Sequence, residues 1–168
     1  MNVDLLGEAK RRLEAGHPAS ARDLAEQALD AARASHSGAG IARAAQLLGE
    51  CLYVVGDVDG AGELGREARG LDEERGDAAA LGADLNLLGV VALTTGQMDE
   101  GRALFRRSLD LREEALGPDH EETIESLNNL GVAMWSSGAQ DEASPCMRTH
   151  CDGASGRWGR RIDAPPRP

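Results

Sequence analysis

The stretch from Thr123 to Ala143, TIESLNNLGVAMWSSGAQDEA, decides the fold. Apolar residues recur in its first half at spacings of three and four, which places one apolar stripe along a helix. Gly138 stands where that helix must end and the chain must turn. Ala143 is a small residue early in the returning segment, where two helices can cross closely. The stretch therefore predicts two antiparallel helices joined by a short turn.

The same landmarks recur along the chain at intervals of 40 to 42 residues. The turn glycine recurs as Gly16, Gly56, Gly96 and Gly138. Five positions after each turn glycine comes a small residue: Ala21, Ala61, Gly101 and Ala143. A Leu-Gly pair precedes the last three turns, at Leu48-Gly49, Leu88-Gly89 and Leu130-Gly131. Small residues let paired helices pack closely, and a period of this length is typical of stacked helical hairpins.

These landmarks resemble those of the tetratricopeptide repeat family. The third copy is most similar to the longer repeats of kinesin light chains, through Leu111-Arg112-Glu113, Leu116-Gly117-Pro118-Asp119-His120, Thr123 and Ser126 to Gly131. The resemblance implies an all-α, right-handed superhelical solenoid of about 3.5 to 4 repeats over residues 1–145. The expected repeats are roughly 1–36, 37–76, 77–118 and a truncated 119–145. We expect helices at about 2–15, 18–35, 38–55, 58–74, 77–95, 98–116, 120–137 and 140–150.

The tail from 146 to 168 does not continue the pattern. It has no helical stripe and ends in prolines, so as written it is expected to be disordered. A shift of the coding frame would restore a leucine at position 151 and a glycine at position 159, where the repeat register requires them. Our hypothesis is that the recorded chain is a frameshifted fragment of a longer repeat protein. The last hairpin would then lack its cap, and we expect self-association or fraying there.

Composition narrows the class of protein. The 168 residues are enough for one domain, and only 2% of them are aromatic, which favours a helical core of Leu, Ala and Val. Residues 1–145 hold 13 basic and 27 acidic residues, a formal charge of −14. Such a charge disfavours nucleic acid as a partner and permits a basic peptide, although solubility alone also accounts for it. The single lysine beside 17 arginines suggests a GC-rich, bacterial genome.

No segment suggests a membrane or secreted protein. The chain has no apolar run long enough to span a bilayer and no apolar signal core at its start, so we expect a cytoplasmic protein. The cysteines form no disulfide framework. Cys51 is expected in the core, and Cys146, His150 and Cys151 offer too few ligands for a closed zinc site.

The sequence also lacks the marks of an enzyme. It has no phosphate-binding loop, no nucleophile elbow and no carboxylate pair with a plausible base. We therefore expect no catalytic residues, no cofactor and no metal. His17, His36 and His120 lie at expected turns, where capping or solvent contact is the simplest interpretation, and Asp119 is expected to cap the seventh helix.

The resemblance implies where a partner would bind. In this family the first helix of each hairpin lines a concave groove that holds a partner segment. Equivalent positions form an amide ladder of Gln46, Asn86 and Asn128, and an apolar stripe of Tyr53, Leu93 and Trp135. The same face carries the charged residues Arg43, Glu50 and Glu125. Amides can hold the backbone of an extended peptide, and aromatic side chains are favoured at binding hot spots.

Two interpretations of these residues stay open. The amides could instead bond neighbouring helices, and Trp135 could pack on a missing next repeat. The leading functional hypothesis is a non-enzymatic module that binds a peptide or a partner domain. The alternative is a sensor region of a larger regulator, joined to a kinase, a nucleotide-dependent switch or a DNA-binding domain.

Overall fold

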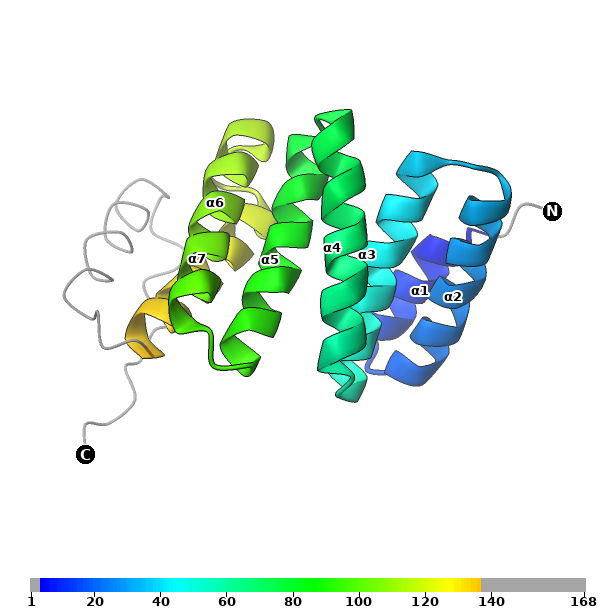
Figure 1. Cartoon of the computed structure of the whole chain (residues 1–168), viewed down its shortest axis with the longest axis horizontal. Coiled ribbons are helices and arrows are strands. Elements are labelled where there is room, and N and C mark those ends of the chain that lie inside the picture. Colours follow the sequence, from blue (N-terminus) through cyan, green and yellow to red (C-terminus); the bar gives the residue numbers. More distant parts are fainter. Residues whose placement is uncertain (1–3, 137–168) are drawn as a thin grey trace.

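The computed structural model describes residues 4–136 of the chain (Figure 1). It contains, in those residues, the helices α1 (Leu5–Glu14), α2 (Pro18–Ala34), α3 (Gly38–Val55), α4 (Val58–Arg75), α5 (Ala78–Thr94), α6 (Met98–Leu116) and α7 (Glu121–Ser136). These bounds confirm seven expected helices to within a few residues at each end. The eighth expected helix and the tail lie outside the described residues.

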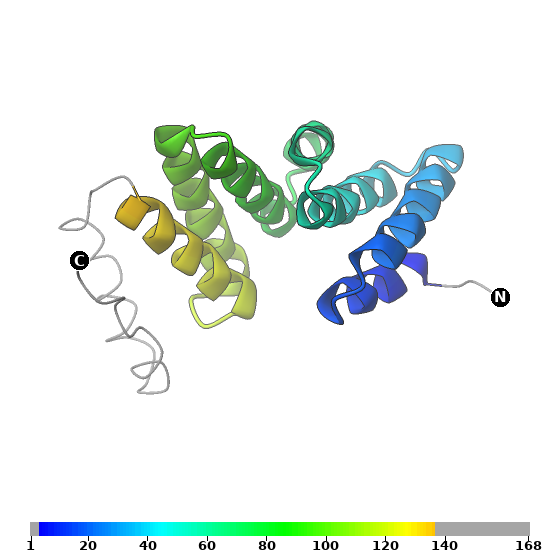
Figure 2. The ribbon, with the colours of Figure 1, turned by 90° about the horizontal axis from the view of Figure 1, so that it is seen from below.

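The helices stack as consecutive antiparallel hairpins. Each helix packs mainly on its neighbours in the chain, and α1, α3, α5 and α7 also pack side by side. The helices α2, α4 and α6 do not pack on one another in this way, although the exposed ion pairs Arg33–Glu67 and Arg107–Glu73 join them. The odd-numbered helices therefore form the inner layer of an arch, whose two ends are α1 and α7 (Figure 2). The all-α solenoid predicted from the repeat period is confirmed.

The repeated landmarks have direct physical roles. The turn glycines Gly16, Gly56 and Gly96 have φ of 78°, 94° and 82°. This left-handed backbone conformation is unfavourable for residues that have a Cβ. The Leu-Gly glycines lie where two helices touch. A Cβ on Gly89 would come within 2.7 Å of the Phe105 ring, and a Cβ on Gly49 within 2.8 Å of Leu87. The repeat therefore depends on small residues at these crossings.

The core is built mainly from Leu and Ala. An N-terminal cluster includes Ala25, Leu29 and Leu48, and a second cluster gathers around Phe105 and Leu130. Cys51 is fully buried, as expected, and burial raises the pKa of its thiol to about 11. The thiol is therefore protonated at neutral pH and behaves as a packing residue.

Candidate partner-binding cleft

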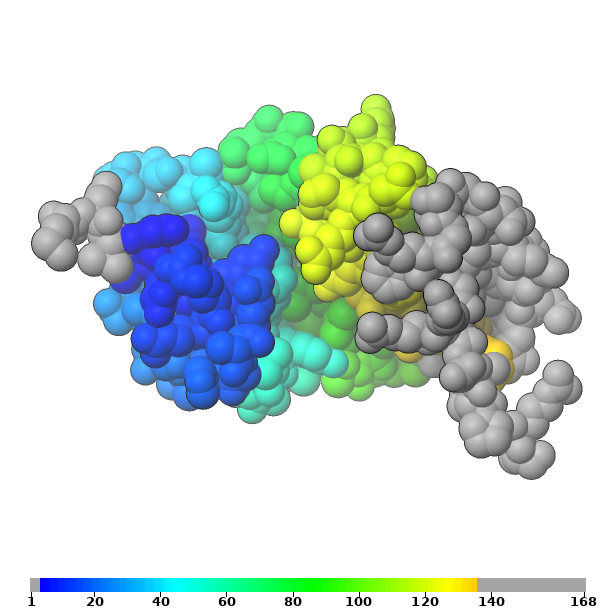
Figure 3. Space-filling model, turned by 180° about the vertical axis from the view of Figure 1, so that it is seen from behind, coloured from blue at the N-terminus to red at the C-terminus, as the bar shows by residue number. Residues whose placement is uncertain are grey.

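A cleft of about 640 Å³ opens on the inner face of the arch. The α1 surface forms one side and the corner between α6 and α7 forms the other, with a hollow between them in Figure 3. The lining residues are Asp4, Leu6, Gly7, Lys10, Glu14, Arg43, Gln46, Leu47, Glu50, Ala83, Arg112, His120, Glu121, Glu122 and Glu125. Segments more than 100 residues apart in sequence thus meet at one site.

The cleft is predominantly acidic. Its lining, among the described residues, includes six carboxylates, three basic side chains and one histidine. One of the three basic groups, Arg112, is already paired with Glu122 and Glu125. Lys10 and Arg43 form no ion pair within residues 4–136 and offset part of the remaining negative charge. The resulting field favours a cationic ligand.

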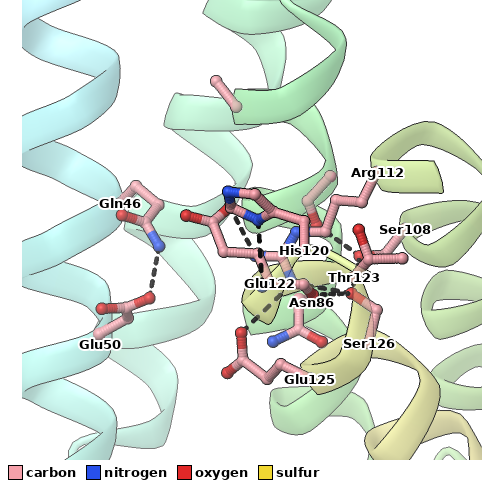
Figure 4. A network of polar contacts seen from close by, with 12 residues as sticks. Gln46, Glu50, Asn86, Ser108, Arg112, His120, Glu122, Thr123, Glu125 and Ser126 are labelled. Carbon is pink, nitrogen blue, oxygen red and sulfur yellow. Dashed lines mark hydrogen bonds and ion pairs between the residues drawn. The ribbon is translucent and has the colours of Figure 1, made fainter. Parts of the chain in front are cut away.

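Glu50 on α3 is one of the acids that line the cleft. Its carboxylate accepts a hydrogen bond from the Gln46 amide nitrogen at 2.5 Å, one turn earlier on α3 (Figure 4). Burial raises the pKa of Glu50 to about 7, and the negative charge of Glu125 on α7 adds to the rise. Lys10 and Arg112 act in the opposite direction. Glu50 is therefore partly protonated at neutral pH, and a bound cation would favour its charged form.

The α6–α7 corner is held by Arg112. Its Nη1 donates to Ser126 Oγ at 2.7 Å and to the Glu122 carbonyl at 2.8 Å (Figure 4). Ser126 in turn lies 2.9 Å from Ser108, whose hydroxyl donates to the Gly82 carbonyl at 2.6 Å. This buried network connects α5, α6 and α7, so the side of the cleft that carries Glu122 and Glu125 is fixed in place.

Arg112 and His120 line the cleft but were not among the expected groove residues. Those residues were taken only from the first helix of each hairpin, and Arg112 lies on a second helix. Arg112 lies on the same buried face of α6 as Gly101, Phe105 and Ser108. A charged residue at a buried position needs a partner, and this feature of the sequence could have identified Arg112. His120 lies at the start of α7, where its Nδ1 accepts from the Glu122 backbone N–H at 3.3 Å. His120, rather than Asp119, therefore supplies this cap, because its ring nitrogen reaches the first turn.

Four of the expected groove residues do line the cleft: Arg43, Gln46, Glu50 and Glu125. Of the three amides in the expected ladder, only Gln46 lines the cleft. Asn86 is buried, and its Oδ1 accepts from the Asn129 side chain at 3.0 Å. Asn128, one position before Asn129 on α7, is exposed and has no part in that pair. Gln46 is engaged with Glu50. Only the Asn86–Asn129 pair joins neighbouring helices, as in the alternative interpretation, because Gln46 and Glu50 lie one turn apart on α3.

The expected apolar stripe is also interrupted. Leu93 packs against the Phe105 cluster, and its Cδ2 would be 2.8 Å from a Cβ on Gly101. Tyr53 places its hydroxyl 3.2 Å from Thr94 Oγ1, between α3 and α5. Trp135 is 54% exposed on α7. None of these three residues lines the cleft. Each lies near the C-terminal end of its helix, whereas the cleft residues of α3, α5 and α7 lie closer to the N-terminal end than these three do. Their roles in partner binding stay predictions.

Within residues 4–136, no three His, Cys, Asp or Glu side chains are grouped so as to hold a metal ion. Cys146, His150 and Cys151 lie outside the described residues. None of the helices described is both long and apolar enough to cross a membrane.

Comparisons with known proteins agree with the repeat pattern. The tetratricopeptide repeat family model matches residues 77–154. A putative kinesin light chain with nearly identical TPR-like repeats, from Podosopora anserina, is 18% identical with a TM-score of 0.76, over 92% of this chain and 76% of that one. BtubC (BKLC) from P. vanneervenii is 16% identical with a TM-score of 0.71, over 95% of this chain and 67% of that one. MamA is 17% identical with a TM-score of 0.65, over 98% of this chain and 80% of that one.

A search of curated proteins found no match. The solved structures are distant in sequence and show the fold alone, whereas the family model matches the sequence itself. The family model shows tetratricopeptide repeats over residues 77–154, and the solved structures show that the described residues have the fold of such repeats.

Proposed function

We propose that this protein is a non-enzymatic interaction module that holds an extended, basic segment of a partner protein in the acidic cleft. Tetratricopeptide repeats are in general scaffolds for protein–protein interaction, which supports the class of function. The observation that carries the finer proposal is the position of Glu50 and Glu125. They approach one cleft from α3 and α7, and the charge of Glu125 adds to the rise in the pKa of Glu50.

A guanidinium or ammonium group relieves that repulsion. Placed between the two carboxylates, it would form charge-assisted hydrogen bonds with both and would stabilise the ionised form of Glu50. Binding of a basic side chain is therefore coupled to loss of a proton from Glu50 near neutral pH. The partner segment would enter from the open side of the arch, where Lys10 and Arg43 favour a carboxylate elsewhere on the same segment.

The test uses fluorescein-labelled nonapeptides of Gly and Ser with two arginines, and matched peptides with two glutamines. We expect the arginine peptide to bind the full chain more tightly by fluorescence anisotropy at physiological salt. Glu50→Gln and Glu125→Gln should each weaken that binding severalfold. The matched control is Glu63→Gln, an exposed position on the outer helix α4, which should leave binding unchanged.

Calorimetry in two buffers of different ionisation enthalpy should show proton release on binding of the arginine peptide, and Glu50→Gln should abolish it. Equal affinity for the two peptides, or equal loss in Glu63→Gln, would refute the cationic site. No binding of either peptide, and none of a larger arrayed peptide set, would refute the cleft as a peptide-binding site.

A further inference from the structure

Two buried carboxyl groups meet where the second repeat joins the third. Asp72 lies near the end of α4 and is 2% exposed, and Asp84 lies in the second turn of α5 and is 0% exposed. The two residues belong to the packed helices α4 and α5, and the charge of Asp72 and a side-chain hydrogen bond to it are among the causes that raise the pKa of Asp84. Neither oxygen of Asp84 receives a hydrogen bond from another donor of the described residues. Two ionised carboxylates in such a place would repel strongly, without water to screen them.

The next repeat carries different side chains at the two equivalent positions. Asp72 is equivalent to Arg112, 40 residues later, and Asp84 is equivalent to Ser126, 42 residues later. There Arg112 donates to Ser126 at 2.7 Å, so the junction between helices is closed by a permanent donor. At Asp72 and Asp84 both partners are acids. A hydrogen bond between these two side chains is possible only when one of them carries a proton.

The surrounding charges do not neutralise a second carboxylate. On α4, Arg75 donates to Asp72 at 2.6 Å and also pairs with Asp77 at 3.4 Å, so its charge is already shared by two acids. From α3, Glu50 adds negative charge. From α6, Arg112 packs its side-chain methylenes against Gly82, but its guanidinium is bound to α7. Burial and the charge of Asp72 together raise the pKa of Asp84 to about 8.

We propose that a proton shared by Asp72 and Asp84 closes the α4–α5 junction, and that loss of this proton opens the junction and changes the width of the cleft. The geometry gives the reason. Repeats before the junction supply one side of the cleft, through α1 and α3, and helices after it supply the other, through α6 and α7. The two sides are joined through the packing of α4 and α3 on α5 (Figure 1).

The composition of α4, the helix that carries Asp72, favours opening at the α4–α5 junction. Gly60, Gly62, Gly65 and Gly70 all lie within α4, and each interior glycine lowers the stability of a helix. Repulsion between the two carboxylates therefore acts on a helix that four glycines weaken. The inference goes beyond the proposed peptide binding and holds whatever ligand the cleft takes.

The experiment is hydrogen exchange on the full chain at pH 6.5 and 9.5, expressed as protection factors so that the intrinsic pH effect cancels. We expect protection across residues 69–85 to fall at least tenfold more than protection in α2. The radius of gyration from X-ray scattering should grow over the same pH range. Asp84→Asn, which supplies a permanent amide donor to Asp72, should remove both changes. Glu50→Gln should leave both changes in place.

Asp84→Ser, copied from Ser126, is the second variant if the asparagine variant folds poorly. Retention of the parent's pH response in a folded Asp84 variant would overturn the proposal. A uniform loss of protection over all helices would also overturn it, as would loss of the response in Glu50→Gln alone. Because no peptide is present, these results are independent of the binding test above.

Discussion

The guanidinium of Arg112 donates to Ser126 Oγ at 2.7 Å, whereas the equivalent residues one repeat earlier, Asp72 and Asp84, are two buried acids. One packing position in the solenoid thus carries a permanent donor in one repeat and a titratable pair in another. This difference separates a rigid α6–α7 corner from a pH-sensitive α4–α5 junction.

Arg112→Met should destabilise the fold by about 2 kcal/mol, because the Glu122 carbonyl and Ser126 lose a buried charged donor. The measurement is urea unfolding followed by circular dichroism. Arg107→Met is the matched control, since Arg107 lies on the same helix and pairs with Glu73 at an exposed site. The control should change stability by no more than about 0.5 kcal/mol. Equal effects of the two substitutions would show that the corner network has no special role.

Gly70→Ala should stabilise the protein by about 0.5–1 kcal/mol, because a Cβ there meets nothing within 4 Å and alanine favours the helix. Gly65→Ala on the same helix should destabilise it by about 1 kcal/mol, because its Cβ would lie 3.0 Å from Leu88. Thermal unfolding of both variants measures the contrast. A stabilising Gly65→Ala would show that α5 can move away without cost.

The Asn86–Asn129 hydrogen bond should appear as a coupling of about 0.5–1.5 kcal/mol in a double-mutant cycle with alanine. Asn128→Ala, at the neighbouring exposed position, should show no coupling to Asn86→Ala. The cycle is measured by urea unfolding of the single and double variants. Coupling of Asn86 to Asn128 instead of Asn129 would contradict this pairing.

Stability should fall as pH rises from about 4.5 to 8. The pKa of Glu50 is raised to about 7 and that of Asp84 to about 8 in the folded chain, from ordinary values near 4. The folded state therefore binds more protons than the unfolded state in this window, and raising the pH favours unfolding. Urea midpoints at pH 5, 6.5 and 8.5 provide the test. The double variant Glu50→Gln, Asp84→Asn should flatten the profile, and a parent profile that rises through this window would contradict the assignment.

The fold was predictable because it depends on local patterns that repeat. The Leu-Gly pairs mark helix crossings, and the turn glycines mark left-handed turns. A close crossing or a left-handed turn each needs a single glycine, as at Gly89 and Gly56. The cleft was predictable only in part. Arg43, Gln46, Glu50 and Glu125 share one face of first helices, so their offsets from the glycine located them.

The remaining contacts of the cleft and of the helix interfaces depend on how one repeat is rotated against the next. That rotation pairs Asn86 with Asn129 rather than with Asn128, and it turns Leu93 toward Phe105. It also brings His120 and Arg112, from a turn and a second helix, to the same cleft as Lys10. None of these contacts follows from a period, because equivalent positions in successive repeats need not touch.

The helices, their order and the small residues at their crossings follow from the spacing of residues within one repeat. The tertiary structure decided which side chains face each other across repeats, including the acidic cleft and the Asp72–Asp84 pair. The physical reason is that burial and charge interactions depend on distances through space, which the curvature of the stack sets and the spacing along the chain does not.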